Sequence, residues 1–492
     1  MREPLACALL AAYLLVVMGM GVLAGRRGRD DADDFVAGDR AFGPLVMYFV
    51  MGATLFSAYA LLGTPQRVVA KGSDVFYVLA YGSVGLVPLF YVGARVRRWG
   101  ARHGFVTQAE LVGARFDSRA ITAMMAVGTL VAFWPYLVIQ LKAAAIVVSW
   151  ATGWESAAIG SGLVAAVVSF YVIRGGVRGV GWTNVLQGLA MLLIVWGVGL
   201  WIPHHLYGGV GPMLDRLALE HPEMLTLPGP GPTTAGQYSS EVFVSLLGFS
   251  VWPHVFMKCF TARSARLVRW SVVVYPSFLF FLLPLIFLGW VAFLEGGPAK
   301  DTVLLWLVDH EAIGAGPVIA ALVAFAVLAA SMSTLDALLH AGGSVLVRDL
   351  GVRVLGWQIG GREETRRMKL AIAVLALSAW LGLGVAERVS VFDLLLIGYD
   401  FIVQFVPVLY LGVLWRGANR VGAISGLASG LALTLLLQLW STFAPESYAA
   451  WNPAALRPGV WALGLNLGIL VLLSALRGPD ARAHLDRFFP PR

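Results

Sequence analysis

The chain has 492 residues, of which 59% are hydrophobic and only 13% are charged, and its mean hydropathy is +0.78. With 17 Trp and 26 Phe in addition, this apolar content excludes an ordinary water-soluble protein and predicts an integral membrane protein. The net charge of +8 does not indicate nucleic-acid binding, because the positive residues fall where cytoplasmic loops of membrane proteins carry them.

Apolar runs of about 20 residues, the length that crosses a bilayer as a helix, predict about thirteen membrane-spanning helices in an all-α polytopic protein. No long polar segment separates the runs, so we expect one transmembrane domain over residues 1–492 and no fused catalytic or sensor domain. In chain order the runs are 3–24, 43–68, 74–94, 120–149, 155–173, 183–203, 239–259, 270–293, 316–346, 369–387, 391–414, 420–442 and 459–476.

The positions of Lys and Arg predict the orientation. With the N-terminus outside, the cytoplasmic segments hold 28 of the 36 basic residues and the outer segments hold 7, while Lys142 lies inside a span. Because Lys and Arg are enriched in cytoplasmic loops, we expect an outer N-terminus and a cytoplasmic C-terminus. The expected location is a plasma membrane, the inner membrane of a bacterium.

Two predicted spans contain helix-breaking residues near their middle. The first carries Gly52 and Ser57, and the second carries Gly248, Pro253 and His254. Such residues release backbone amides and carbonyls, which must then find other partners inside a membrane. The two spans are five apart and cross in opposite directions, which favours an inverted repeat with a binding site at the midplane. The alternative is a pair of ordinary proline-kinked packing helices.

Two adjacent hydroxyls, Ser333 and Thr334, lie in the apolar run 316–346. Hydrocarbon does not solvate them, so they must face a partner, a cavity or an ion. Ala330, Ser333 and Thr334 have the i, i+3, i+4 spacing that places one carbonyl and two hydroxyls on one helix face. Neutral oxygens of this kind suit a small hard cation such as sodium. The alternative is that both hydroxyls bond to carbonyls one turn earlier in the same helix.

Several motifs occur together in a fixed order. In this order, over nearly the whole length, the chain resembles the sodium:solute symporter family, which has thirteen helices and a LeuT-type core. The motifs are Asp34-Phe-Val-Ala-Gly-Asp-Arg40, Val106-Thr-Gln-Ala-Glu110, Arg115-Phe-Asp-Ser-Arg119, the run Gly175 to Gly188, Pro253-His254, Ala330 to Thr334 with Arg348-Asp349-Leu350, and Gln404-Phe-Val-Pro407 with Trp415.

The resemblance implies a LeuT-type 5+5 inverted-repeat core. Its first repeat would cover residues 43–203 and its second 239–414, with peripheral helices and a short cytoplasmic tail over 420–492. It also implies a sodium site between the first and eighth core helices. The ligands would be the carbonyls of Ala53, Phe56 and Ala330 and the hydroxyls of Ser333 and Thr334. Some family members carry an acidic residue where this chain has Leu55, so no mechanism with a carboxylate there applies.

Charged residues inside spans are expensive and are usually functional or paired. Lys142 has three interpretations: its stem reaches the outer interface, it binds the carboxylate of an organic anion, or it pairs with Asp400 as part of an outer gate. The third and tenth core helices of a LeuT-type core flank the external pathway, so these two charges are candidates to meet. Asp336 points away from the Ser333 face, and we interpret it as a proton carrier or as a buried hydrogen-bonding group.

The resemblance also indicates which residues line the solute cavity or its gate, although the same residue types are equally common in plain helix packing. These are Ser57, Tyr136, Gln140, Lys142, Ser245, Phe249, Trp252, Asp400 and Gln404.

The predicted function is sodium-coupled symport of a small organic solute by alternating access, and Lys142 favours a solute that bears a carboxylate. No hydrolytic, phosphate-binding or metal constellation predicts an enzyme. The expected partners are the solute, Na+ as coupling ion and the lipid bilayer, without nucleic acid. Two alternatives stay open: a proton-coupled or exchanging transporter of the same fold, and a non-transporting membrane sensor.

Overall fold

The computed structural model describes residues 3–26, 31–231, 233–386 and 389–489. Within these ranges every regular element is helical, and the only strand-like feature is an isolated bridge between Phe42 and Ala262. The predicted all-α membrane fold is confirmed. Five basic residues that entered the orientation count lie outside the described residues: Arg2, Arg27, Arg29, Arg388 and Arg492.

The apolar runs coincide with helices. Nine segments of the described residues are long and apolar enough to cross a membrane. Two of them, Tyr59–His103 and Ala157–Tyr207, each cover parts of two predicted runs, and the runs 239–259 and 369–387 are not among the nine. The predicted number of thirteen is therefore not confirmed. The principal helices are α1 (Pro4–Gly25), α3 (Pro44–Leu55), α5 (Tyr77–Val84), α6 (Val87–His103), α8 (Arg119–Thr152), α9 (Ala157–Tyr207), α11 (Ala235–Phe249), α14 (Ala265–Leu279), α15 (Leu282–Leu294), α17 (Gly316–Ser344), α18 (Gly361–Leu381), α20 (Val391–Ile402), α22 (Arg420–Phe443) and α24 (Pro458–Arg477).

Shorter helices cap the bundle or continue the long ones. Three are π-helical: η2 (Tyr59–Gly63), η6 (Val345–Val354) and η7 (Pro407–Leu411). Four are 3-10 helices: η1 (Gly38–Arg40), η3 (Gly72–Phe76), η4 (Pro222–Leu225) and η5 (Glu311–Ile313). The short α-helices are α2 (Ala32–Ala37), α4 (Thr64–Lys71), α7 (Gln108–Arg115), α10 (Val210–Glu220), α12 (Pro253–Phe256), α13 (Lys258–Thr261), α16 (Val303–Asp309), α19 (Leu383–Ala386), α21 (Gly412–Leu414), α23 (Pro445–Trp451) and α25 (Arg482–Leu485).

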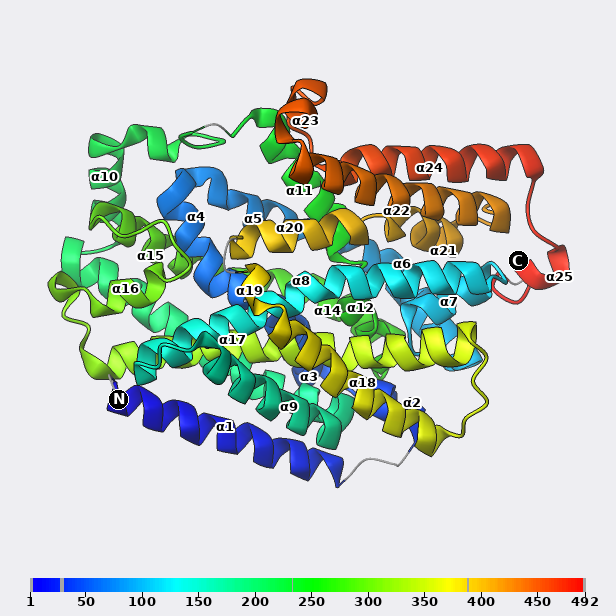
Figure 1. Cartoon of the computed structure of the whole chain (residues 1–492), viewed down its shortest axis with the longest axis horizontal. Coiled ribbons are helices and arrows are strands. Elements are labelled where there is room, and N and C mark those ends of the chain that lie inside the picture. The colour runs from blue at the N-terminus through cyan, green and yellow to red at the C-terminus, as the bar shows by residue number, and fades with distance from the viewer. Residues whose placement is uncertain (1–2, 27–30, 232, 387–388, 490–492) are drawn as a thin grey trace.

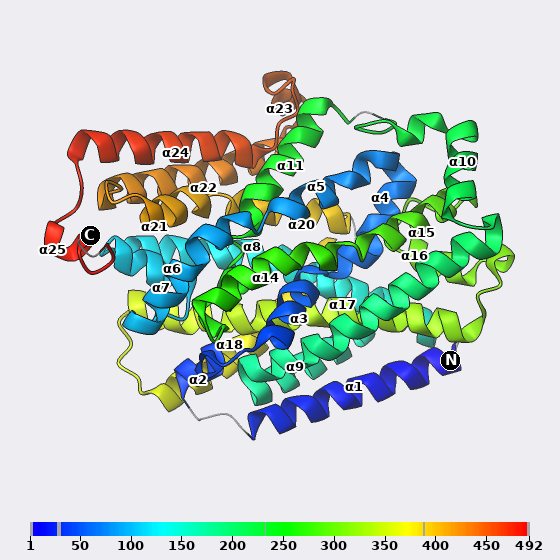
Figure 2. The same cartoon turned by 180° about the vertical axis from the view of Figure 1, so that it is seen from behind.

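The long helices run side by side along the bundle (Figure 1). Helix α1 lies along one edge, α22 and α24 pack against each other at the opposite edge, and α3, α8 and α17 lie between them (Figures 1 and 2). The two ends of the chain lie at opposite ends of the bundle (Figure 1). We call the end with α2, α7 and α25, which the sequence predicts to face the cytoplasm, the inner end, and the opposite end, with α10 and α16, the outer end.

Helix α9 consists of two arms that reverse direction at Gly176, whose φ of 53° and ψ of −152° are not helical. The first arm follows α1, since Gly21 abuts Tyr171 and Gly25 abuts Arg174. The second arm returns along α1, because the side-chain Nε2 of Gln187 donates to the hydroxyl of Tyr13 at 2.7 Å. The runs 155–173 and 183–203 are thus two separate arms, and the motif Gly175 to Gly188 forms the turn and the start of the second arm.

Gly176→Ala is expected to lower the free energy of unfolding by about 1–3 kcal/mol, because a non-glycine residue is strained in this backbone conformation. Its Cβ would also lie 2.9 Å from the ring of Phe35. Gly197→Ala, in the helical second arm with nothing within 4 Å, is the matched control. Thermal unfolding of the purified protein measures both, and equal melting temperatures for the two variants would contradict the assignment of the turn.

Candidate functional site

The first helix break lies between α3 and η2. Helix α3 ends at Leu55, and Phe56 turns out of the helix with φ −85° and ψ 78°. The freed backbone groups find side-chain partners, as a buried break requires. The amide of Ala58 donates to the carboxamide oxygen of Gln140 on α8 at 3.0 Å, and the amide of Tyr59 donates to the hydroxyl of Ser57 at 3.2 Å.

The second break lies between α11 and α12. Helix α11 ends at Phe249, and the chain becomes helical again at Pro253, whose ring nitrogen has no hydrogen to donate. Gln108 of α7 donates to the freed carbonyl of Val251 at 3.1 Å. Both spans are therefore broken rather than merely kinked, as the sequence predicts.

Helix α17 is joined to the last turn of α3 by hydrogen bonds from two hydroxyls. The hydroxyl of Ser333 lies 3.0 Å from the carbonyl oxygen of Ala53 and 2.9 Å from that of Ala330. The hydroxyl of Thr334 donates to the carbonyl of Thr54 at 3.0 Å. Ser333 thus makes the bond within its own helix that the alternative interpretation expects, and a second bond across to α3, whereas Thr334 bonds across to α3. All five residues are buried.

This cluster consists of neutral oxygens only. A hydroxyl can both donate and accept a hydrogen bond. If the hydroxyl proton of Ser333 or Thr334 rotates away from the carbonyl, the hydroxyl oxygen can bind a cation. Phe56, the fifth predicted ligand, is not among the residues that these hydroxyls contact, and its ring packs on Phe278 and Phe281. Thr54 was not predicted, because a backbone carbonyl leaves no mark in the sequence.

Asp336 lies behind this cluster and faces α9. Its carboxylate accepts hydrogen bonds from Tyr171 at 2.8 Å, from Thr183 at 3.2 Å and from Asn184 at 3.2 Å. Thr54 in turn donates its hydroxyl to Asn184 at 3.2 Å. Asp336 therefore points away from Ser333, as the helix geometry predicts, and holds α9 and, through Asn184, the broken end of α3.

A small closed cavity lies between the two breaks, with a volume of ≈ 10 Å³. Four predicted solute residues line it, namely Ser57, Tyr136, Phe249 and Trp252. Six further residues that were not predicted as solute residues also line it. Aromatic and aliphatic residues near a helix break cannot be told from packing residues by sequence alone. The six residues are Leu55, Tyr59, Tyr81, His254, Leu395 and Tyr399.

The comparisons with known proteins agree with one another. The model of the "Sodium:solute symporter family" matches residues 35–430. The chain belongs to this family. It is 26% identical to an uncharacterized symporter, YhjB, of Bacillus subtilis, over 97% of this chain and 99% of that protein. It is also 26% identical to the sodium/pantothenate symporter of Escherichia coli, over 87% of this chain and 89% of that one.

The fold matches that of a solved Na+-coupled sialic acid symporter in an outward-open state. The TM-score is 0.80 at 18% identity, and the match covers 98% of this chain and 100% of that one. Relatives and neighbours are transporters of the LeuT-type fold and not enzymes, as the sequence predicts.

The side chain of Lys142 does not pair with that of Asp400. Its ammonium group donates to the carboxylate of Asp301 at 2.7 Å and to the carbonyl of Val389 at 3.0 Å, at the outer end. The Lys142–Asp400 pair, one of the three interpretations of Lys142, is wrong, because the loop before α16 supplies the partner. Asp301 has no periodic sequence pattern that would have revealed it.

Three other predicted solute residues face neighbouring helices. Asp400 forms an ion pair with Arg457 and accepts from Gln438 at 2.6 Å, while Gln404 donates to the carbonyl of Gly459 at 3.1 Å. The hydroxyl of Ser245 lies within 3.4 Å of that of Tyr77. None of these three lines the central cavity; they hold α20 and α11 against their neighbours.

Buried ion pairs flank the site toward the outer end. Arg67 of α4 contacts Asp74 and, at 2.7 Å, Glu241 of α11, and its guanidinium lies 3.6 Å from the ring centre of Phe392 on α20. We call Arg67, Asp74, Glu241 and Phe392 the outer cluster. It connects elements that follow the first break to elements of the second half of the chain.

A second network lies at the inner end. Glu110 of α7 accepts from Arg348 at 2.6 Å and from Arg353 at 2.9 Å, and Arg348 also pairs with Asp33 at 2.6 Å. We call Glu110, Arg348, Arg353 and Asp33 the inner cluster. It joins α2 and α7 to η6, which continues α17 toward the inner end.

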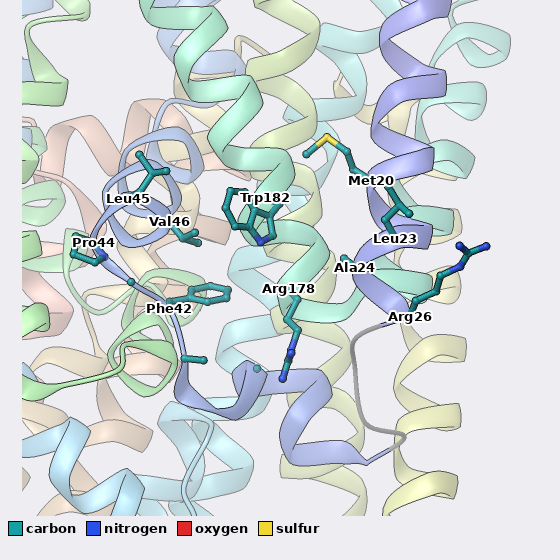
Figure 3. A pocket seen from close by; sticks show the side chains of 13 residues that line it. Met20, Leu23, Ala24, Arg26, Phe42, Pro44, Leu45, Val46, Arg178 and Trp182 are labelled. Carbon is teal, nitrogen blue, oxygen red and sulfur yellow. The ribbon is translucent and has the colours of Figure 1, made fainter.

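A larger groove of ≈ 700 Å³ opens between α1, α3 and α9. Figure 3 shows its apolar lining, with Met20, Leu23, Phe42 and Trp182, beside Arg26 and Arg178. No residue at either break lines this groove, so it is not part of the candidate site.

The inner cluster predicts a pH-dependent stability. Burial by itself would raise the pKa of Glu110, but the charges of Arg348 and Arg353 outweigh it, so this pKa lies below its ordinary value of 4.5. Stabilisation by a carboxylate with a depressed pKa is complete above its unfolded-state pKa and is lost as the pH falls through the folded-state pKa. Thermal unfolding at pH 7 and at pH values below 4.5 measures this loss.

Glu110→Gln is therefore expected to melt at a lower temperature than the unmodified protein at pH 7, and the difference should shrink as the pH falls below about 4.5. Glu363→Gln is the matched control, because Glu363 pairs with Arg367 on an exposed helix surface, where such pairs contribute little. A pH-independent difference for Glu110→Gln would show that its charge is not what stabilises the inner end.

Proposed function

We propose that this protein is a sodium-coupled symporter that imports a small organic solute by alternating access. The proposal depends on one observation above all: two hydroxyls of α17 contact carbonyls at the broken end of α3, beside a closed cavity that lies between two broken helices. Membership of the sodium:solute symporter family supports sodium as the coupling ion.

In this proposal sodium binds between α3 and α17. The carbonyls of Ala53 and Ala330 and the hydroxyls of Ser333 and Thr334 contribute ligands, and Phe56 or Thr54 supplies a further carbonyl. The ion takes the place of the direct hydroxyl–carbonyl hydrogen bonds. A site without a carboxylate binds a cation weakly enough to release it, which transport requires. Each charge that crosses about 100 mV supplies about 2.3 kcal/mol to the solute gradient.

Alternating access then opens one end at a time. The outer cluster and the inner cluster are both paired in this structure, and the cavity between them is closed. Import requires the outer cluster to separate first and the inner cluster to separate second. The repeats 43–203 and 239–414, and an outer N-terminus, fit this cycle and are part of the proposal.

The proposed solute bears a carboxylate. Two relatives are named for pantothenate and sialic acid, and both molecules carry a carboxylate. Lys142 no longer supports this assignment, since Asp301 occupies its ammonium group. A carboxylate in the cavity would lie near the sodium site, where the ion's charge favours it.

Sodium is expected to raise the melting temperature of the purified protein relative to potassium at equal ionic strength, because a ligand of the native state stabilises it. At 100 times its dissociation constant the ion would contribute about 2.7 kcal/mol. Ser333→Ala and Thr334→Ala should each weaken the apparent sodium affinity about tenfold or more, equivalent to about 1.4 kcal/mol.

Ser344→Ala is the matched control, since that hydroxyl lies on the same helix and bonds only to the carbonyl of His340 within it. Stabilisation by a lower pH, with no difference between sodium and potassium, would favour proton coupling and would contradict this proposal.

A further inference from the structure

The central cavity holds two polar side chains that lack hydrogen-bond partners. Both ring nitrogens of His254 and the hydroxyl of Tyr59 are buried without a partner among the described residues. The two side chains are 1% and 3% exposed. A buried donor or acceptor without a partner costs about 1–3 kcal/mol, so nearly all such groups in native proteins are paired.

The neighbours of His254 hold its ring in place without bonding to it. Its ring centre lies 5.5 Å from those of Trp252 and Phe133 and 5.9 Å from that of Tyr136. These aromatic contacts fix where the imidazole points, and they leave both nitrogens for another molecule. His340, which is also buried, differs from His254 in that its ring forms a hydrogen bond with the carbonyl of Phe35 at 2.9 Å.

The two unpartnered groups come from equivalent places in the two breaks. Tyr59 follows the non-helical Phe56 and Ser57 of the first break, and His254 follows Trp252 and Pro253 at the end of the second. Each break therefore presents one unsatisfied polar group to the same cavity. A solute that contacts both groups would contact both broken helices at once.

The rest of the cavity lining is uncharged. Beside His254 its polar groups are the hydroxyls of Ser57, Tyr59, Tyr81, Tyr136 and Tyr399 and the indole N–H of Trp252, and no Lys, Arg, Asp or Glu is among the lining residues of the described part of the chain. An anion in this cavity must accordingly be recognised by hydrogen-bond donors and by the nearby cation rather than by a basic side chain. A neutral imidazole offers one N–H donor, and a phenol offers one O–H donor.

We propose that His254 determines the solute specificity of this transporter, by donating a ring N–H to a carboxylate oxygen of the solute while Tyr59 donates its hydroxyl to the same group. This inference rests on the proposed function and names the recognition element of its cavity. The closed cavity, at ≈ 10 Å³, is at the lower limit for one water molecule, so these contacts form when the helices around it separate.

A structural and a recognition role for His254 predict opposite effects on stability. Replacing an imidazole that bonds to the protein leaves its partner unpaired and destabilises the fold. His254→Phe removes no hydrogen bond within the protein, so its melting temperature should equal or exceed that of the unmodified protein. His340→Phe, which leaves the Phe35 carbonyl without its partner, should melt lower and serves as the matched control.

The test is sodium-driven uptake into proteoliposomes of radiolabelled acetate, pyruvate, lactate and pantothenate, with the corresponding amides as unlabelled competitors. At least one carboxylate should accumulate, and its amide should compete about tenfold more weakly or worse. His254→Phe should lower this uptake at least tenfold and abolish the preference for the carboxylate over the amide. His254→Gln, which keeps a donor, should retain most of the preference, and Tyr59→Phe should weaken it.

Sodium-dependent thermal stabilisation should be unchanged in His254→Phe, which separates this inference from the sodium site. Unchanged uptake and preference in His254→Phe would overturn the assignment of His254. Accumulation of none of the four carboxylates by the unmodified protein would overturn the proposed ligand class. A protein that sodium does not stabilise at all would refute the proposed function itself, and this inference with it.

Discussion

The hydrogen bonds from Ser333 and Thr334 to the carbonyls of Ala53 and Thr54 are the contacts on which the rest of the structure depends. A helix that ends inside a membrane exposes carbonyls that hydrocarbon cannot solvate. Helix α17 satisfies two of them with hydroxyls, and these hydroxyls lack solvent for the same reason. The carbonyls at the break in α3 and the hydroxyls of α17 thus satisfy one another's hydrogen-bonding capacity, so neither group is left without a partner in the membrane. An ion that accepts both sets of oxygens as ligands competes directly with this contact.

The charged residues of the two clusters act away from this centre. Arg67 with Glu241, and Arg348 with Glu110, are buried pairs, in which the cost of burial offsets part of the attraction between the charges. Their position on either side of the cavity gives them a further use, because charges that regain water when they separate recover part of the attraction that is lost. Neutral oxygens at the centre and separable ion pairs at both ends are what a carrier with two accessible states requires.

The sequence predicts those features that follow from local chemistry. The apolar runs place most helix boundaries within a few residues, and Gly52, Ser57 and Pro253 mark both breaks. The spacing of Ala330, Ser333 and Thr334 is enough to identify the polar face of α17. Backbone carbonyls such as that of Thr54 carry no side-chain signal, however, and the unpartnered imidazole of His254 becomes informative only when its surroundings are visible.

The errors of prediction concern charged residues whose partners lie in connecting segments. Lys142 and Asp400 both lie in spans, whereas Asp301 precedes α16 and Arg457 precedes α24. Loop residues follow no helical period that would place them near a given helix face, so tertiary structure alone determines which loop reaches which charge.

Equilibrium binding of radioactive sodium to the purified protein tests the sodium site between α3 and α17 most directly. We expect saturable binding that Ser333→Ala weakens at least tenfold and that Ser344→Ala leaves unchanged. Saturable binding with the same affinity in Ser333→Ala, or no saturable binding to the unmodified protein, would contradict a sodium site between α3 and α17.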